Sequence, residues 1–185
     1  MTPFAHLSGG FLVTQIADMI NPAWGFNRPE VIITSLIGAN LPDFDVFIVG
    51  GLKDHRNTIT HAPLFWIIVM SLLYLISLFI GNSFITLNIV SFSLGLFTHF
   101  LFDWFAAREK DSGGIRLLYP FSKKHYGFHK LKDMPKYMTG KINFKKFIKF
   151  YSADKLLFYV EVSLIVIAII IFLIRAPGYW HYFFK

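Results

Sequence analysis

The side chains best suited to chemistry in this 185-residue chain begin with a histidine and an aspartate four positions apart, His99 and Asp103. On a helix, residues at this spacing lie one above the other on a single face, so the imidazole and the carboxylate can reach one metal ion. An isolated pair of this kind is more often a plain hydrogen bond at a helix end. The rest of the chain decides between these two interpretations.

Three other segments carry side chains of the same types. Leu41-Pro42-Asp43-Phe44-Asp45 holds two carboxylates, the run from His55 to His61 begins and ends with an imidazole, and His6 lies close to the start. Each segment lies at the end of a stretch that we predict to be helical. This repetition favours a shared metal site over an isolated hydrogen bond.

Carboxylates and imidazoles together suit Zn, Mn or Fe, and the chain has no cysteine that could add a thiolate. There are more of these groups than one tetrahedral ion needs, which favours two divalent ions, with zinc as the first expectation. Such ions activate water and hold a phosphate group. The candidate metal ligands are His6, one of Asp43 and Asp45, His55, His61, His99 and Asp103.

Asp45 and Arg56 are the predicted catalytic residues. Asp43 and Asp45 stand too close in the chain for equal roles, so we expect one to bind metal and the other to orient a ligand from behind. Arg56 has a permanent, forked charge that suits a phosphate oxygen, although a plain interfacial anchor is an equal alternative. We expect Thr58 and Thr60 to cap the helix that follows.

The helices that must position these residues belong to a membrane protein. Hydrophobic residues make up 55% of the chain and charged residues only 16%, which excludes an ordinary soluble domain. Uncharged runs from Ala62 to Ile80 and from Phe84 to His99, joined at Gly81-Asn82-Ser83, predict a transmembrane hairpin. A third span is predicted from Leu156 to Ile174. We expect one all-α membrane domain over residues 1–185.

Two shorter helices are predicted before the hairpin, from about Ala5 to Ile20 and from Pro29 to Leu41. Both are short for spanning, so they either cross or pack half-buried against the three long helices. With them the protein is a polytopic bundle of about five helices. Asp18 and Glu161 lie deep in apolar runs and are either functional acids or hydrogen-bonded partners between helices.

Residues 106–154 form a basic segment that contains 12 of the 18 lysines and arginines. The positive-inside rule places this segment, and with it all the candidate ligands, on the cytoplasmic side of a prokaryotic inner membrane. Within it, the spacing of Phe144, Phe147, Ile148 and Tyr151 between lysines predicts an amphipathic helix on anionic lipid headgroups. A basic helix packed on its own protein is the alternative.

His125 and His129 are also four positions apart, and they complete a second metal site if this part of the basic segment is helical. Contact with lipid headgroups is the other interpretation. Nucleic acid is excluded as a partner because the basic segment lies at a membrane and has no recognised binding motif. The chain also lacks the His-Glu-x-x-His motif of zinc proteases and the wider His/Asp spacing of membrane acyltransferases.

Together these motifs resemble those of the YdjM family of membrane-bound, predicted metal-dependent hydrolases, also described as LexA-binding and inner-membrane-associated. The resemblance covers roughly residues 1–130. It implies the ligand role for His6, Asp43, His61, His99 and Asp103, with His55 next, and a distant likeness to zinc-dependent phospholipase C implies phosphoester hydrolysis. The elements that carry it are His6, Pro42-Asp43-x-Asp45, His55-Arg56, Thr60-His61, Gly95-x-x-x-His99-x-x-x-Asp103 and Gly114-Ile115-x-Leu117-Leu118-Tyr119-Pro120.

We therefore expect a membrane-embedded hydrolase that cleaves a phosphoester of a lipid at the cytoplasmic face with metal-activated water. The alternative is a non-catalytic protein, either a metal-binding scaffold for a soluble regulatory protein or an ion-coupled carrier. A carrier needs ionisable groups near the midplane, whereas the candidate ligands gather at helix ends.

Overall fold

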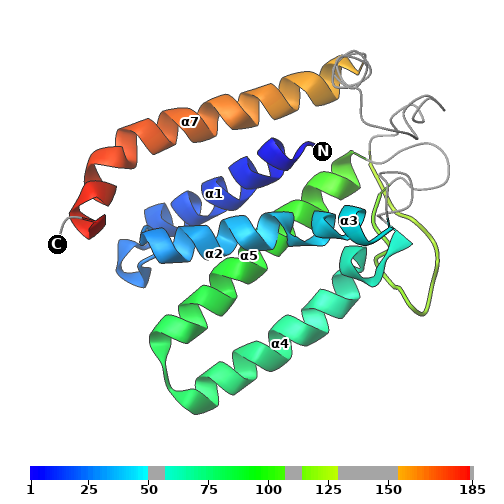
Figure 1. Cartoon of the computed structure of the whole chain (residues 1–185), viewed down its shortest axis with the longest axis horizontal. Helices are drawn as coiled ribbons and strands as arrows, with labels where there is room; N and C mark the ends of the chain where they lie inside the picture. Colours follow the sequence, from blue (N-terminus) through cyan, green and yellow to red (C-terminus); the bar gives the residue numbers. More distant parts are fainter. Residues whose placement is uncertain (50–56, 107–113, 129–153, 184–185) are drawn as a thin grey trace.

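A computed structural model describes residues 1–49, 57–106, 114–128 and 154–183 of the chain (Figure 1). Within these residues the fold is all-α, and its one β-type pairing is an isolated bridge between Ile115 and Tyr126. In the described part of the chain, five long helices form the bundle: α1 (Pro3–Ile20), α2 (Pro29–Asn40), α4 (Pro63–Ile80), α5 (Ser83–Phe105) and α7 (Lys155–Phe183). Short helical turns join them: η1 (Pro22–Trp24), η2 (Leu41–Asp45), α3 (Val46–Val49) and η4 (Ile59–His61).

Among the described residues, three helices are long and apolar enough to cross a membrane: α4, α5 and Lys155–Tyr179 of α7. This confirms the predicted hairpin and third span. At the turn between α4 and α5, Gly81 adopts a left-handed conformation with φ +70°. The Asn82 side chain accepts hydrogen bonds from the N–H groups of Phe84 and Ile85, so the hairpin is closed by a glycine stop and an asparagine cap.

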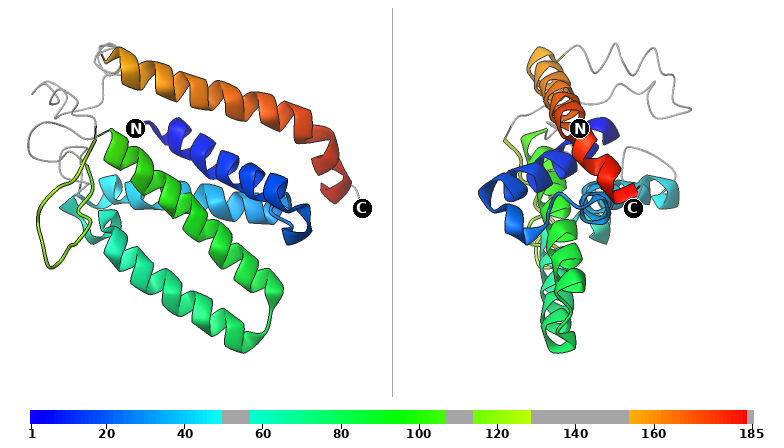
Figure 2. Two further views of the ribbon diagram at one scale, coloured as in Figure 1. Left: turned by 180° about the vertical axis from the view of Figure 1, so that it is seen from behind. Right: turned by 90° about the vertical axis from the view of Figure 1, so that its left-hand side faces the viewer.

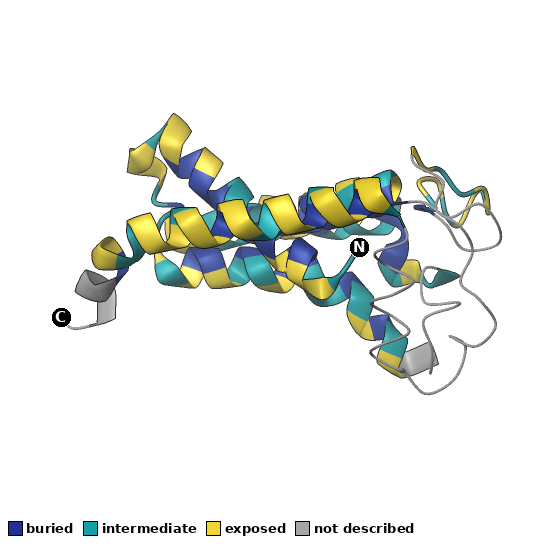
Figure 3. Cartoon of the chain, turned by 90° about the horizontal axis from the view of Figure 1, so that it is seen from above, coloured by how far each residue is buried: buried dark blue, intermediate teal, exposed yellow. Residues whose placement is uncertain are grey.

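The two predicted N-terminal helices are also present, and they lie at the centre of the bundle. In Figures 1 and 2, α1 lies between α7 and the α2/α5 pair. At about 1.5 Å per residue, the 12 residues of α2 extend about 18 Å, which is less than the ~30 Å hydrocarbon core. Figure 3 shows α7 with a largely exposed outer face, as a helix facing lipid requires.

Backbone contact between α2 and α5 is unusually close because glycine faces the partner helix from both sides. A Cβ added at Gly95 would lie 2.1 Å from the Ser35 carbonyl oxygen, and one added at Gly38 would lie 2.3 Å from that of Phe92. Small residues at helix interfaces allow such approach in membrane proteins. Gly95 lies one turn before His99, so the close contact also places that histidine against α2.

Asp18 and Glu161, the two acids in apolar runs, join α7 to α1. This agrees with the prediction that they are hydrogen-bonded partners between helices. Glu161 accepts hydrogen bonds from the backbone N–H and the hydroxyl of Thr2, at 3.0 and 2.8 Å. Near the other end of α1, Arg175 forms a 2.8 Å ion pair with Asp18. Both acids therefore have structural partners.

Candidate metal centre

The candidate ligands come from separate parts of the chain but lie at one end of the bundle, which we call the cluster end. The first turns of α1 carry His6, η2 after α2 carries Asp43, and η4 before α4 carries His61. The last two turns of α5 carry His99 and Asp103. Figure 1 shows the end of α2, the start of α4 and the end of α5 together at the right. Alternating helix direction thus brings the motifs to one side.

Four of these residues form a group that could hold a metal ion, which we call the Asp/His cluster. It consists of Asp43, His61, His99 and Asp103, and one ligand atom from each lies within 4.8 Å of all the others. His99 Nε2 is 3.6 Å from Asp103 Oδ2, as the four-residue spacing predicts, and His61 Nε2 is 3.7 Å from the same oxygen. The Asp43 Oδ1 atom faces both imidazoles, at 3.3 Å from His61 and 3.9 Å from His99.

His6 faces the other oxygen of each carboxylate. Its Nε2 atom is 3.8 Å from Asp43 Oδ2 and 3.8 Å from Asp103 Oδ1. The His6 ring stacks on the His99 ring with a centroid separation of 4.2 Å. Each carboxylate therefore has one oxygen facing His61 and His99 and the other facing His6, which stacks on His99.

The partners of His61 and His99 fix which nitrogen can bind a cation. His99 Nδ1 is 2.8 Å from the Ala39 carbonyl oxygen, which can only accept, so Nδ1 carries the proton and Nε2 has the free lone pair. His61 Nδ1 is likewise 2.9 Å from Asp45 Oδ2. Both Nε2 atoms point into the cluster. Backbone carbonyls and carboxylates hold metal-ligating imidazoles in this way.

Asp45 has three hydrogen-bond partners around one oxygen atom. Besides His61, its Oδ2 atom accepts from the Thr60 hydroxyl at 2.9 Å and from the Thr58 hydroxyl. The prediction that these threonines cap the next helix is wrong. Ala62 is the N-cap of α4 and Thr58 makes no side-chain capping bond, because both hydroxyls turn toward the buried carboxylate instead.

The electrostatics of the cluster favour a cation. Burial alone would lower the pKa of His61, but the hydrogen-bonded carboxylates of Asp43 and Asp45 outweigh burial and raise the pKa to about 9. Burial would also raise the pKa of Asp43, yet its hydrogen bond to His61 and the nearby imidazole of His99 hold that pKa below its ordinary value. The carboxylate is thus ionised at neutral pH.

Unpaired buried nitrogens give the clearest sign that the cluster binds a ligand. Across the described residues, the buried side-chain nitrogens without a hydrogen-bond partner are Nδ1 and Nε2 of His6 and Nε2 of His99. Burying a polar atom without a partner costs free energy, so such atoms need an explanation. A divalent cation among these nitrogens and the neighbouring carboxylates would satisfy His6 Nε2 and His99 Nε2, which fits the donor set of a zinc-type site.

Some predicted site residues are not in this group. His55, Arg56 and His129 lie outside the described residues, as does the predicted amphipathic helix around residues 144–151. His125 is described, but the helix that would pair it with His129 is not formed there, because Tyr126 pairs with Ile115 in the isolated bridge. His125 Nε2 instead accepts a hydrogen bond from Arg116 Nε at 3.1 Å.

Arg116 makes further contacts that the sequence did not suggest. Its two Nη atoms donate to the carbonyl and the side-chain oxygen of Asn57, at 3.0 and 2.6 Å. These bonds attach residues 114–128 to the chain just before Thr58, and thus to the support of Asp45. An arginine in a basic segment gives no sequence signal for this role.

The fold and the cluster define a helical membrane protein with a buried group of histidines and aspartates that could hold a metal ion. The chain belongs to the family of YdjM inner membrane proteins, whose family model matches residues 1–179. The match therefore reaches into the last turns of α7. No curated protein and no solved structure matches the chain.

Proposed function

We propose that this protein is a metal-dependent hydrolase that cleaves a phosphoester of a membrane lipid at the cytoplasmic face. The observation that carries the proposal is the convergence of two oriented imidazoles and two carboxylates in one buried group. A purely structural cluster would satisfy its own nitrogens, whereas here His99 Nε2 has no hydrogen-bond partner among the described residues.

Zinc is the ion that we propose first, since nitrogen and carboxylate ligands in a four-membered set suit it well, with Mn or Fe as alternatives. The His61/His99 side of the carboxylates would hold one ion. The distances from His6 Nε2 to the other oxygen of each carboxylate support a second ion beside His6.

A divalent ion held here would supply a more acidic water molecule and neutralise charge on a phosphoryl oxygen. In the hydrolysis, water oxygen bonds to phosphorus, the phosphorus–oxygen bond to the leaving alcohol breaks, and the alcohol takes up a proton. Asp45 would keep the His61 ring in its productive orientation. The Asp43 side chain is 21% exposed while those of His61 and Asp103 are fully buried, so substrate and water would enter past Asp43.

Arg56 remains the proposed phosphate-holding residue, and the positive-inside rule supports a site that faces the cytoplasm. Replacement of Arg56 by lysine should keep the metal but lower the rate, because lysine retains the charge and loses the bidentate fork. Single cysteines at Ser122 and Ser83 test the orientation in intact cells. An impermeant thiol reagent should label Ser83→Cys and spare Ser122→Cys, and the reverse pattern would contradict a cytoplasmic site.

Purified protein in lipid nanodiscs tests the activity directly. With zinc present, we expect release of phosphate or of a phosphorylated headgroup from a phospholipid or a polyprenyl phosphate, abolished by chelator and by Asp103→Asn. Asp18→Asn is the matched control, because Asp18 is also buried but bonds to Arg175 far from the cluster. The contrary result is a metal-replete protein that cleaves no lipid of a broad panel and binds a soluble partner in a metal-dependent way. That result would contradict the hydrolase and favour a metal-binding scaffold.

A further inference from the structure

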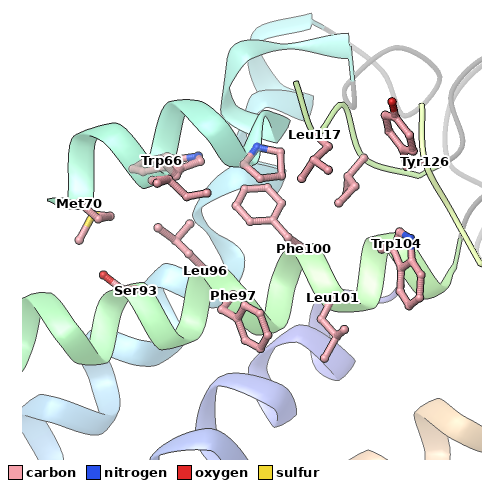
Figure 4. Close-up of a pocket in the computed structure, with 13 residues that line it drawn as sticks. Trp66, Met70, Ser93, Leu96, Phe97, Phe100, Leu101, Trp104, Leu117 and Tyr126 are labelled. Atoms are coloured by element: carbon pink, nitrogen blue, oxygen red, sulfur yellow. The ribbon is translucent and has the colours of Figure 1, made fainter. Parts of the chain in front are cut away.

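An apolar cavity of about 470 Å³ lies between α4, α5 and residues 114–128, and we call it the α4/α5 groove (Figure 4). Figure 4 shows Leu96 and Phe100 rising from α5 toward Trp66 on α4, with Leu117 closing the space from the loop side. The volume is within the ~300–1,000 Å³ range of small-molecule sites.

The groove offers almost no free polar group to an occupant. Four of its lining side chains carry a polar atom, those of Trp66, Ser93, Trp104 and Tyr126, and two of them are bonded inside the protein. Trp66 Nε1 donates to the Thr60 carbonyl and the Ser93 hydroxyl donates to the Ile89 carbonyl, each at 2.8 Å. Apart from the Trp104 indole and the Tyr126 hydroxyl, the remaining lining is aromatic and aliphatic. An occupant is therefore hydrocarbon in character.

The length of the groove matches one leaflet of a bilayer. Its lining on α5 runs from Ser93 to Trp104, which is about 16 Å at ~1.5 Å per residue. Half of a ~30 Å hydrocarbon core is about 15 Å. Since α4 and α5 are both candidate membrane spans, the surrounding solvent is lipid, and a lipid chain is the hydrocarbon available at that depth.

One end of the groove lies at the cluster end of the bundle, level with the Asp/His cluster. Trp104 follows Asp103 directly, and Pro63 lies two residues after His61. The Phe100 ring lines the groove, and its centroid is 5.5 Å from that of His99. A lipid with a chain in the groove would therefore hold its headgroup at the helix ends where the cluster lies. A partner helix, ~10 Å across with its side chains, is too wide for this cavity.

We propose that the α4/α5 groove binds one hydrocarbon chain of a lipid from the leaflet at the cluster end and so places the lipid phosphate beside the Asp/His cluster. The placement of the phosphate rests on the proposed hydrolase function, whereas the binding of the chain does not.

Photocrosslinking tests the binding of the chain without any turnover. The probe is phosphatidylglycerol with a diazirine near the end of one acyl chain, at trace level in phosphatidylglycerol/phosphatidylethanolamine nanodiscs that contain the full-length protein. In the wild type, adducts mapped by mass spectrometry should concentrate on groove residues such as Met70 and Leu96. Adducts spread evenly over the lipid-facing sides of α4, α5 and α7 would overturn the proposal.

Filling the groove sharpens this test. Ser93→Phe should reduce the groove adducts about tenfold, because overfilling a packed space excludes the chain. The matched control Ser71→Phe adds the same ring at an exposed position of α4 outside the groove and should leave the adducts unchanged. Leu117→Trp fills the groove from the loop side and should act like Ser93→Phe, so the result does not depend on one variant folding well. If Ser93→Phe and Leu117→Trp both fold and neither reduces the groove adducts, the proposal is overturned.

Kinetics separate this inference from the proposed function. Ser93→Phe should raise KM for a long-chain lipid phosphoester about tenfold and leave cleavage of a short-chain, water-soluble phosphoester unchanged. Equal losses on both substrates would overturn the placement of the lipid by its chain. If the wild type cleaves neither substrate, the hydrolase proposal fails, and the crosslinking result alone decides whether the groove binds lipid.

Discussion

The two ends of α1 contain buried polar side chains in opposite situations. At the far end, Asp18 bonds to Arg175 and Gln15 accepts a hydrogen bond from the Tyr179 hydroxyl. At the cluster end, both nitrogens of His6 are buried without a hydrogen-bond partner among the described residues. The fold evidently can pair polar groups within the bundle, so the unpaired nitrogens at one end point to a ligand rather than to poor packing.

The close helix contact beneath the cluster should give the largest effect. Gly95→Ala places a Cβ 2.1 Å from the Ser35 carbonyl oxygen, so α2 and α5 must separate and His99 must leave Ala39. We expect the free energy of unfolding to fall by about 3 kcal/mol and metal binding to be lost. Thermal unfolding in detergent and metal analysis measure both. Gly178→Ala, which has open space around its Cβ, is the control, and equal behaviour of the two variants would contradict the tight contact.

A change at Asp45, which holds the His61 ring from behind the cluster, should have the next largest effect. Asp45→Asn keeps the size of the side chain but weakens its bond to His61 Nδ1, and removal of such a partner typically lowers metal affinity about 10 to 100-fold. Competition with a fluorescent zinc chelator measures the affinity. Asp18→Asn should have the wild-type affinity. An unchanged affinity in Asp45→Asn would mean that Asp45 does not orient a metal ligand.

Loss of the ion pair at the far end of α1 should lower the stability of the protein without changing its metal content. Arg175→Gln breaks the ion pair with Asp18 and leaves that carboxylate buried, so we expect the free energy of unfolding to fall by about 1–2 kcal/mol. Metal content should not change, because the pair is at the far end of α1. Lys155→Gln, at an exposed position at the start of α7, is the control. Loss of metal in Arg175→Gln would show that the two ends are coupled.

Replacement of His6 should have the smallest effect on stability, and it tests most sharply whether the buried nitrogens at the cluster end are unpaired. In chelator-treated protein, His6→Phe should raise the free energy of unfolding by about 1 kcal/mol, because it removes unpaired nitrogens and keeps an aromatic ring against His99. His61→Phe should destabilise the same protein, since its nitrogens have carboxylate partners. Chemical unfolding of the two variants compares them. Destabilisation by His6→Phe would argue that His6 has a structural role.

Most of the fold could be predicted because each helix carries its own signals. Uncharged runs of the right length give α4, α5 and α7, and proline in the first turn marks the starts of α1, α2 and α4. The common location of the ligands also follows from the sequence, because every motif lies at an end that alternating helices bring to one side.

The details around the ligands could not be predicted because they depend on tertiary contacts. The Ala39 carbonyl reaches His99 across 60 residues of chain, and no side-chain signal marks a backbone acceptor. Thr58 and Thr60 have the residue type and position of helix caps, but a buried carboxylate attracts their hydroxyls more strongly than the exposed helix start. The helical pairing of His125 failed because the pairing of Ile115 with Tyr126 determines the local backbone.

The central claim, that the Asp/His cluster holds a divalent metal, is tested most directly by elemental analysis of the purified protein. Wild-type protein should contain bound metal, with zinc expected first, and His99→Ala should lose most of it. His125→Ala should keep the wild-type content, because His125 bonds to Arg116 outside the cluster. Full metal content in a folded His99→Ala protein would contradict the account.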